Sequence, residues 1–567
     1  MKRIVQRRGP VPDLPGVPPF LRRVYGHRGV GTLADLDLAL SGLERPSALR
    51  DIDQAAGRIA EAVREGQRIL LVGDFDADGA TSVALGVSLL RAFGASNVDF
   101  VVPNRFEFGY GLSPEIVDLA LLHSPDLIIT VDNGVSSIAG VERANAHGVD
   151  VVVTDHHLPG PHLPPACAIV NPNVPGCAFP SKAIAGVGVI YYVLGQTRAV
   201  LRAGGWFDGS ARPEPLLADW LDLVALGTVA DVVPLDRNNR RLVHQGIKRM
   251  RSGRCRPGIA ALAEAGRRDL ARLKASDLGF AVGPRLNAAG RLDDMTIGIQ
   301  CLLASSLEEA RPLAGQLDDL NRKRRGIEQS MLADAEILLA EAEGGIEGKC
   351  GIVVFHPSWH QGVVGLIAGR LRERHHRPVI AFAQAGAEGL ELKGSARSLP
   401  ELHVRDALDA IAARDPALLT RFGGHAMAAG MTLDRRCLPR FAQAFDDEVR
   451  RRLPAEALQG RLETDGELEA DELTLDNARR VAEAGPWGQA FPEPMFHGDF
   501  DLVSQRVVGK EHLKLVLKRA DRLVGAIAFR QKPIPDCQRV RLAYALEVND
   551  YRDPALELRV TQIEPLT

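Results

Sequence analysis

Three aspartates stand on alternate positions of one short segment, directly after an apolar run and directly before a segment of helical character. The segment reads Val72-Gly73-Asp74-Phe75-Asp76-Ala77-Asp78-Gly79. Carboxylates this close repel one another, and the repulsion costs free energy unless a cation or protons relieve it. Gly79 permits a tight turn into the following helix. The segment therefore predicts a divalent-metal site at the end of a β-strand.

Two further apolar, β-branched runs also end in polar residues. Residues 127–131 lead into Asp132-Asn133-Gly134, and residues 149–154 lead into Asp155-His156-His157. Amphipathic segments lie between and beside these runs, at 80–93, 114–122 and 136–147. Strands that alternate with helices predict a parallel sheet with right-handed crossovers, and the carboxyl ends of such strands meet at one crevice. We therefore expect an α/β fold in which these strand ends converge on one site.

The residue types indicate which metal the site would bind. Aspartate oxygens suit Mg²⁺ or Mn²⁺, and a histidine nitrogen favours Mn²⁺. The seven cysteines are scattered and form no Cys-x-x-Cys pair, which argues against a structural zinc site. Asp231 lies inside the apolar run 226–234, where an acid needs a partner, so it is a candidate further ligand. A helix cap or a buried salt bridge is the alternative role for Asp231.

Four of these segments, in this order, resemble the motifs of the DHH phosphoesterase superfamily: 74–79, 132–134, 155–157 and 227–231. Within the superfamily the chain is similar to the RecJ family, bacterial exonucleases that degrade single-stranded DNA from 5′ to 3′. Phe75 is a mild departure, because tyrosine is frequent there, but the position is not a ligand. The resemblance covers most of the chain. It implies a parallel-sheet DHH domain, a smaller α/β DHHA1 domain joined to it by a long helix, and a C-terminal β-barrel of the OB-fold type.

The resemblance also implies two divalent cations, Mn²⁺ or Mg²⁺, and assigns their ligands. Asp76 and Asp132 would hold one ion, with Asp74 close by as a further or supporting acid. Asp132 would also contact the other ion and so bridge the pair. The second ion would have three further ligands: Asp78, His156 and Asp231.

The remaining residues of the Asp-His-His motif would act on the phosphate or support the ligands. His157 would face the phosphate, and Asp155 would orient a histidine, the usual role of an acid beside a ligating imidazole. The catalytic residues implied are Asp132, His156 and His157. A surface loop after a strand is the alternative for the two histidines.

Candidate DNA contacts occur in three other segments. Arg105 lies in the glycine-punctuated loop 102–111, where a solvated arginine is the alternative. The segment 282–291 combines small residues with groups suited to phosphate, namely Arg285, Asn287 and Arg291. In the DHHA1-like part, the resemblance places Ser395 and Arg397 on a terminal 5′-phosphate and His425 near the scissile phosphate.

The length of 567 residues predicts several domains. We expect an irregular N-terminal arm, a DHH catalytic domain, a connecting helix, a DHHA1 substrate-binding domain and an OB-fold, in this order: 1–45, 46–305, 306–345, 346–452 and 455–567. Barrel strands are expected from alternating patterns such as 513–518. Aromatic residues that could stack on DNA are sparse there: Trp487, Phe491, Phe496, Phe529, Tyr544 and Tyr551.

Composition and resemblance together set the cellular expectations. The chain shows no run of eighteen apolar residues, no signal-peptide core and no cysteine pattern, which favours the cytoplasm. The net charge of −3 is uninformative about nucleic acid, because basic patches can be local. The resemblance implies a monomer that acts on single-stranded DNA in repair and recombination, with single-strand-binding protein and a RecQ-type helicase as candidate partners and no membrane.

Two other functions stay open from the sequence alone. A DHH phosphodiesterase or phosphatase for short oligonucleotides, cyclic dinucleotides or pyrophosphate would use the same metals, but would not need the barrel or the long helix. A non-catalytic DNA-binding scaffold on the same fold would have lost its metal motifs. The intact acids at 76, 78, 132 and 231 argue against the scaffold.

Overall fold

The computed structural model describes residues 2–104, 111–209, 213–341, 345–346, 348–386, 389–419, 421–509, 511–535, 537–550 and 553–566. The chain divides into two compact units. One comprises Met1–Val5 and Leu320–Leu462, and the other comprises Gln6–Asp319 and Glu463–Thr567. We describe each by itself. Among the helices in these described ranges, none combines the length and the apolar character needed to cross a membrane.

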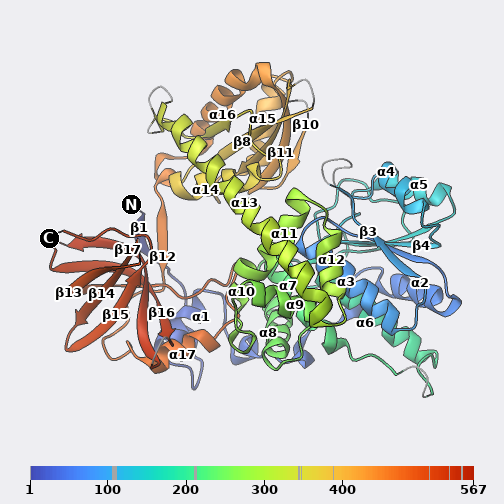
Figure 1. The fold of residues 1–567 in the computed structure, drawn as a ribbon, viewed down its shortest axis with the longest axis horizontal. Helices are drawn as coiled ribbons and strands as arrows, with labels where there is room; N and C mark the ends of the chain where they lie inside the picture. The colour runs from blue at the N-terminus through green and yellow to red at the C-terminus, as the bar shows by residue number, and fades with distance from the viewer. Residues whose placement is uncertain are drawn as a thin grey trace. The chain divides into compact units, whose positions relative to one another are not determined.

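The larger unit contains a five-stranded sheet in the order β3-β2-β4-β5-β6 (Figure 1). Its strands are Val98–Val101, Ile69–Val72, Leu127–Val131, Asp150–Thr154 and Ala168–Val170. All four pairings are parallel, as predicted. From β2 the chain continues to β3 on one side and then to β4 on the other, so the order reverses at β2. The carboxyl ends of strands at such a switch point form the usual ligand crevice of this architecture.

Helices cover both faces of this sheet. Alternate residues of β2, such as Leu70 and Val72, pack with Ile116 of α4 and Val141 of α5. On the other face α3 approaches so closely that a Cβ at Gly86 would collide with Leu71. The helices of this part of the unit, not all of which touch the sheet, are α2 (Ile52–Glu65), α3 (Ala77–Ala92), α4 (Pro114–Leu121), α5 (Ile138–Ala146), α6 (Gly186–Ala203), α7 (Leu221–Ala230), α8 (Arg237–Arg251), α9 (Pro257–Ala265), α10 (Ala275–Asp277), α11 (Gly283–Leu292) and α12 (Thr296–Leu303).

The N-terminal arm is more ordered than the sequence suggested. It forms a strand, β1 (Arg3–Gln6), that pairs with β12 (Arg461–Thr464), and a helix, α1 (Pro19–Gly26). The helix buries Phe20 against Phe496, with ring centroids 6.1 Å apart. Proline and arginine enrichment concealed this short amphipathic helix; the rest of the arm consists of short 3-10 turns and coil.

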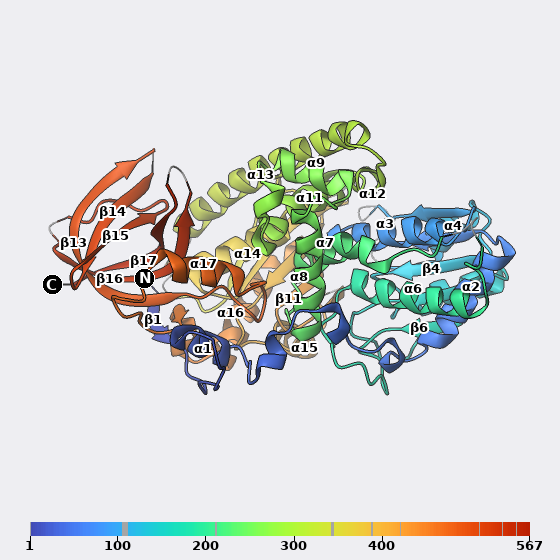
Figure 2. The same ribbon diagram turned by 90° about the horizontal axis from the view of Figure 1, so that it is seen from below.

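The smaller unit holds most of the long helix α13 (Leu307–Glu341), which is continuous over 35 residues as expected (Figure 2). Its sheet has the order β10-β11-β9-β8-β7, in which only β7 and β8 are parallel. The strands are β7 (Ile352–Phe355), β8 (Val379–Ala385), β9 (Glu391–Arg397), β10 (Arg421–Gly424) and β11 (Ala428–Asp434). The helices are α14 (Val364–His375), α15 (Val404–Arg414) and α16 (Leu438–Arg452).

The C-terminal segment of the larger unit is a closed barrel in the order β13-β14-β15-β17-β16, drawn in red in Figure 1. Its strands are Phe496–Val508, His512–Arg519, Arg522–Ala528, Arg539–Asn549 and Ala555–Leu566, listed from β13 to β17, and α17 (Leu475–Glu483) precedes them. This five-stranded barrel has the connectivity expected of an OB-fold.

Most of the barrel's aromatic residues have structural positions. Phe496 and Tyr544 are fully buried. Trp487 stacks on the buried Phe491, with ring centroids 5.2 Å apart. Phe529 is exposed, and Tyr551 lies outside the described residues. Of these side chains, the described ones are therefore mostly packed within the protein and offer few exposed rings.

Candidate metal centre

The acidic segment after β2 forms the N-terminal cap of α3. One carboxylate oxygen of Asp76 accepts hydrogen bonds from the amides of Asp78 and Gly79 at 2.9 and 3.0 Å. Oδ1 of Asp74 accepts the Phe75 amide at 2.8 Å. A Cβ at Gly79 would collide with the backbone of Asp74, so only glycine permits this turn. The cap thus fixes the carboxylates of Asp74 and Asp76 at the carboxyl end of β2, and Asp78 follows them in the first turn of α3.

Asp132 follows β4 in a strained backbone conformation, with φ of 61°. Its amide donates to the carbonyl of Thr154 on the neighbouring strand at 3.0 Å, which holds the turn in place. A Cβ at Gly186 would lie 2.7 Å from Cβ of Asp132. The start of α6 therefore packs directly against this carboxylate, and Gly186 is required for that approach.

Asp155 organises the segment after β5. Its Oδ1 accepts the amides of His156 and His157 at 2.7 and 3.0 Å, and its Oδ2 accepts the Val135 amide at 2.9 Å. Nδ1 of His157 lies 2.7 Å from the same Oδ1. Asp155 thus orients the His157 ring through Nδ1, so a contact with phosphate would use Nε2.

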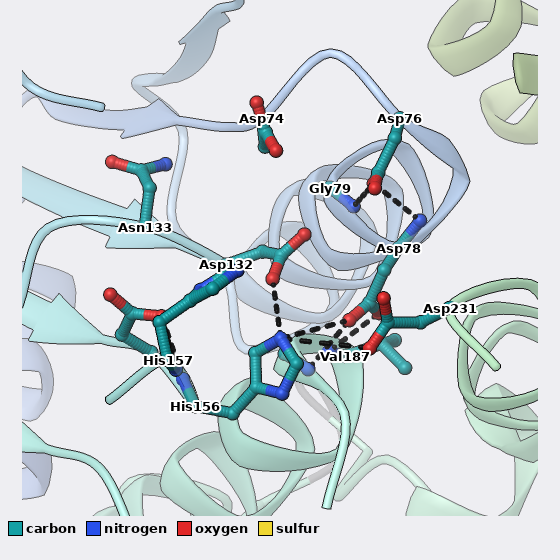
Figure 3. Close-up of polar contacts among 12 residues, drawn as sticks. Asp74, Asp76, Asp78, Gly79, Asp132, Asn133, His156, His157, Val187 and Asp231 are labelled. Atoms are coloured by element: carbon teal, nitrogen blue, oxygen red, sulfur yellow. Dashed lines mark hydrogen bonds and ion pairs between the residues drawn. The ribbon is translucent and has the colours of Figure 1, made fainter. Parts of the chain in front are cut away.

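The structure brings the predicted ligands together, as Figure 3 shows. Nε2 of His156 lies 3.0 Å from Asp132, 3.6 Å from Asp231 and 4.0 Å from Asp78. Three sets of side chains each place one potential ligand atom per residue within 4.8 Å of the others: Asp132 with His156 and His157, Asp78 with His156 and Asp231, and Asp74 with Asp76 and Asp132. Asp132 and His156 each belong to two of these sets, and of the two only the carboxylate has a pair of oxygens with which a side chain could bridge two ions.

The cluster concentrates buried negative charge. Burial, followed by the charges of neighbouring aspartates, raises the pKa of Asp78 and of Asp132 well above the ordinary value. Burial and Asp76 raise the pKa of Asp231 to about 7. Nε2 of His156 and Oδ2 of Asp231 are buried and make no hydrogen bond within the described part of the chain. A carboxylate-rich cluster with these buried atoms fits divalent cations, which would supply compensating positive charge.

The two histidines differ in their protonation. Burial and the adjacent His157 lower the pKa of His156 to about 4, so its imidazole is neutral at physiological pH, as a metal ligand must be. Burial opposes the charged form of His157 as well, but the hydrogen bond and charge of Asp155 outweigh it and raise the pKa of His157 to about 9. A protonated His157 suits contact with an anionic phosphate.

Residues of the 282–291 segment lie beside the cluster but differ in role. Oδ1 of Asn287 accepts the Ala77 amide at 2.8 Å, so this side chain supports the acidic turn itself. Arg285 is buried, donates to the carbonyls of Ala281 and Ala265, and pairs with Asp318 at 2.7 Å. These contacts indicate helix packing for Arg285 in place of the expected phosphate contact.

The structure says less about the contacts of the other two arginines predicted in this unit. Arg291 is half-buried near the C-terminal end of α11. Arg105 lies outside the described residues, so its predicted contact with DNA stays a prediction.

In the smaller unit, Ser395 and Arg397 lie together on β9. Nη1 of Arg397 donates to Oγ of Ser395 at 3.0 Å. A Cβ at Gly365 would lie 3.0 Å from both side chains, so the first turn of α14 packs against them. Burial and the neighbouring Arg372 lower the pKa of Arg397. Nothing acidic lies within ion-pair distance of Arg397 in the residues that the structure describes, and a helix N-terminus beside a half-buried guanidinium favours an anion.

His425 lies in the turn between β10 and β11, beside this pair. β11 pairs with β9 so that Ala428 faces Arg397 and Gly430 faces Ser395. The His425 amide donates to the Ala428 carbonyl at 2.8 Å, and its side chain is exposed. The structure thus places all three predicted residues of the smaller unit at the same end of its strands, where β9 ends and β11 begins.

Sequence reasoning missed the amides that hold Asp78. The amides of Gly186 and Val187, at the first turn of α6, donate to the two oxygens of Asp78 at 2.6 and 3.0 Å. The run Ala185-Gly186-Val187-Gly188 contains small residues of the kind that permit close backbone approach. That pattern was the available signal, although it contains no polar side chain.

Comparison with known proteins gives consistent matches. The family models "DHH family, N-terminal domain", "DHHA1 domain" and "RecJ OB domain" match residues 68–228, 348–451 and 464–562. The chain is 51% identical to the single-stranded-DNA-specific exonuclease RecJ of Salmonella typhimurium over 98% of this chain and 97% of the relative. It is 50% identical to the exonuclease of the same name from Escherichia coli over the same shares.

Solved structures agree with this result. A crystal structure of RecJ with Mn²⁺ from Thermus thermophilus has a TM-score of 0.80 at 32% identity, covering 97% of this chain and 76% of that chain. One with Mg²⁺ from the same organism has a TM-score of 0.72 at 29% identity, covering 97% and 75%. The similarity therefore extends through both units and the barrel.

Proposed function

The chain belongs to the RecJ family of single-stranded-DNA-specific exonucleases, and we propose that it hydrolyses single-stranded DNA from the 5′ end, releasing nucleoside 5′-monophosphates. The observation that carries this proposal is the buried cluster of acids and one neutral histidine around Asp132. The match to an OB domain model distinguishes the chain from phosphatases of short substrates, and the intact ligand cluster distinguishes it from a scaffold.

The residues of the cluster have separate tasks in this proposal. Asp74, Asp76 and Asp132 would hold one divalent cation, Mn²⁺ or Mg²⁺. The second cation would be held by Asp132 together with Asp78, His156 and Asp231. When bound, two such ions lower the pKa of water from about 16 toward neutrality and neutralise charge on the phosphate. The amides of Gly186 and Val187 keep both oxygens of Asp78 in fixed directions.

His157 has a different task. Its pKa of about 9 keeps the imidazole protonated at physiological pH, with Nδ1 bound by Asp155. The other ring nitrogen can then donate a hydrogen bond to a phosphoryl oxygen as negative charge develops there. His157 would therefore add to the neutralisation of the phosphoryl oxygens, whereas activation of the water would depend on the metal ligands alone.

We assign the parts of the chain accordingly. Residues 46–305 carry the hydrolysis, and 346–452 hold the terminal 5′-phosphate through Ser395 and Arg397, with His425 near the scissile phosphate. The helix 306–345 joins them, and 455–567 bind the strand further along. Arg105 and Arg291 are proposed backbone contacts, and the arm 1–45 supports the barrel.

Cellular context follows from the family. We propose that the protein acts in DNA repair and recombination as a cytoplasmic monomer, with single-strand-binding protein and a RecQ-type helicase as partners. The described cysteines are all free thiols, which suits a reducing compartment. Sedimentation of the pure protein, alone and with each candidate partner, tests the oligomeric state and the two interactions.

One assay tests the activity. Single-stranded DNA labelled at the 5′ end or at the 3′ end is incubated with Mn²⁺ or with EDTA, beside a blunt duplex of the same sequence. We expect the 5′ label to appear first as a mononucleotide, the 3′ label to remain on long products, and no cleavage in EDTA or of the duplex. Early release of the 3′ label would contradict the polarity, and hydrolysis confined to dinucleotides would favour the phosphatase.

A further inference from the structure

The first turn of α8 contains an asparagine that joins two loops of the metal centre. Asn239 is fully buried, and its Nδ2 donates to the carbonyls of Ala183 and Pro234, each at 2.9 Å. Its Oδ1 is buried and accepts no hydrogen bond within the described residues. The two donated bonds are therefore the whole polar contribution of this side chain.

Ala183 belongs to the loop that fixes two proposed ligands. The next residue, Ile184, forms a backbone hydrogen bond with the ring of His156. Two residues further, the amides of Gly186 and Val187 hold Asp78. Movement of the Ala183 carbonyl would therefore displace the supports of both His156 and Asp78.

Pro234 belongs to the loop that follows the remaining ligand of the same ion. Asp231 ends α7, and the next residue, Val232, has φ of 62°, a strained value for a β-branched residue. The Leu235 amide donates to the carbonyl of Gln489 at 2.8 Å. A strained turn persists only when its surroundings hold it, and Asn239 supplies one of those contacts.

A second link reinforces the first. Asp236, the N-cap of α8, accepts the Asn239 amide at 2.9 Å and the hydroxyl of Ser181 at 2.6 Å. Ser181 lies in the same loop as Ala183. The start of α8 thus holds both loops by side chains that never enter the ligand cluster.

We infer that Asn239 is a positioning residue that keeps His156, Asp78 and Asp231 in register for one divalent cation. The inference rests on the metal site of the proposed function, but not on its substrate or polarity. Residues that orient metal ligands in this indirect way typically change metal affinity by about 10–100-fold when they are removed.

The adjacent residue provides a matched control. Asn238 is equally buried and is also bound by two groups, because its Oδ1 accepts the Glu44 amide at 3.1 Å and the Tyr192 hydroxyl at 2.9 Å. In the described part of the chain, neither Glu44 nor Tyr192 hydrogen-bonds or ion-pairs with a proposed ligand. Asn238→Ala and Asn239→Ala therefore remove the same buried amide from neighbouring positions, and only the second frees the ligand loops.

The test measures Mn²⁺ binding by calorimetry on the full chain without DNA, beside the thermal unfolding midpoint of each variant. We expect Asn239→Ala to weaken Mn²⁺ binding by about 10-fold or more, and Asn238→Ala to leave it near wild type at a similar loss of thermal stability. Raised Mn²⁺ should restore most of the kcat of Asn239→Ala. Equal weakening in both variants, or none in either, would overturn the inference.

A second pair covers the case in which the alanine variants do not fold. Asn239→Asp keeps the volume but removes both donors, whereas Asn238→Asp keeps the acceptor that its two partners need. Both lie in the first turn of a helix, where negative charge is tolerated. The same difference in Mn²⁺ affinity is expected. If it appears in a protein that proves not to be an exonuclease, the proposed function fails while the positioning role stands.

Discussion

In the larger unit, the buried acids of the metal centre and the buried Asp465 have neighbours of opposite charge. Asp132 and Asp78 are almost wholly enclosed, yet their charged neighbours include other aspartates, and burial with that repulsion raises their pKa values. Asp465 is just as enclosed, but both its oxygens pair with Arg28 at 2.8 and 2.9 Å, and His27 lies 3.0 Å away. Although burial opposes ionisation, Arg28 holds the pKa of Asp465 below its ordinary value.

The difference separates a functional site from a structural one. The negative charge of Asp465 is compensated by Arg28 of the same chain, and this ion pair connects the N-terminal arm to the segment that precedes the barrel. The acids around Asp132 repel one another and are suited to positive charge supplied from outside. Arg397 is the cationic counterpart, since it is half-buried, lies near the like charge of Arg372 and is suited to an anion.

The largest expected effect is on catalysis. Asp132→Ala should lower kcat by about a thousandfold or more, because bound metal contributes several kcal/mol to transition-state stabilisation. The unfolding midpoint of the metal-free protein should not fall, since one of several repelling charges is gone. Nuclease assays and thermal unfolding in EDTA check the two halves. Turnover within about tenfold of wild type would place the metal ligands elsewhere.

The reverse is expected of the structural acid. Asp465→Ala leaves the Arg28 charge buried without its partner, and should lower the free energy of unfolding by about 3–5 kcal/mol. Its kcat per folded molecule should stay at the wild-type value. Glu463→Ala, which removes an exposed acid paired with Arg7, is the control and should cost at most about 1 kcal/mol in a urea titration. A lower kcat in folded Asp465→Ala would contradict a purely structural role for Asp465.

Arg397→Ala extends the comparison to the anion site. Loss of a charge-assisted hydrogen bond worth about 1.5–3 kcal/mol should reduce the preference for 5′-phosphorylated over 5′-hydroxyl ends by about 10–100-fold in kcat/KM. Arg436→Ala, an exposed arginine of the same unit bound to Asp434, should leave that ratio unchanged. A parallel loss on both kinds of end would contradict a terminal-phosphate pocket.

A smaller effect is expected on the pH dependence of stability. Because the pKa of Asp231 is raised from 3.8 to about 7, its protonated form stabilises the folded, metal-free protein at low pH. That contribution is complete below the ordinary pKa and is lost as the pH rises toward 7. The unfolding midpoint in EDTA should therefore fall less steeply between these values in Asp231→Asn than in wild type. An identical slope in both proteins would contradict the raised pKa of Asp231.

The sequence was a good guide where local patterns carry the information. The apolar run before the alternate acids predicted a strand that turns at Gly79 into a helix, and residues 127–131 predicted β4 to the residue. The ligand cluster followed because parallel strand ends must converge. Helix α1 was missed because Phe20 packs against Phe496, which lies far along the chain.

The contacts that support the site were beyond the sequence for the same physical reason. The bonds from Gly186 and Val187 to Asp78, and from Asn239 to Ala183 and Pro234, join segments distant in sequence. Backbone donors and acceptors carry no side-chain signature. The sequence suggested that Arg285 binds phosphate, because its actual partners, two carbonyls and Asp318, are brought to it only by the packing of the helices.

The most direct test of the distinction is a count of bound Mn²⁺. Calorimetric titration of the full chain, without DNA, should give two ions per wild-type molecule. Asp132→Ala should lose tight binding of both, because its carboxylate belongs to two of the potential ligand sets. Asp99→Ala, an exposed acid on β3 of the same sheet, should bind as wild type does. Unchanged binding by Asp132→Ala, or none by wild type, would contradict the account.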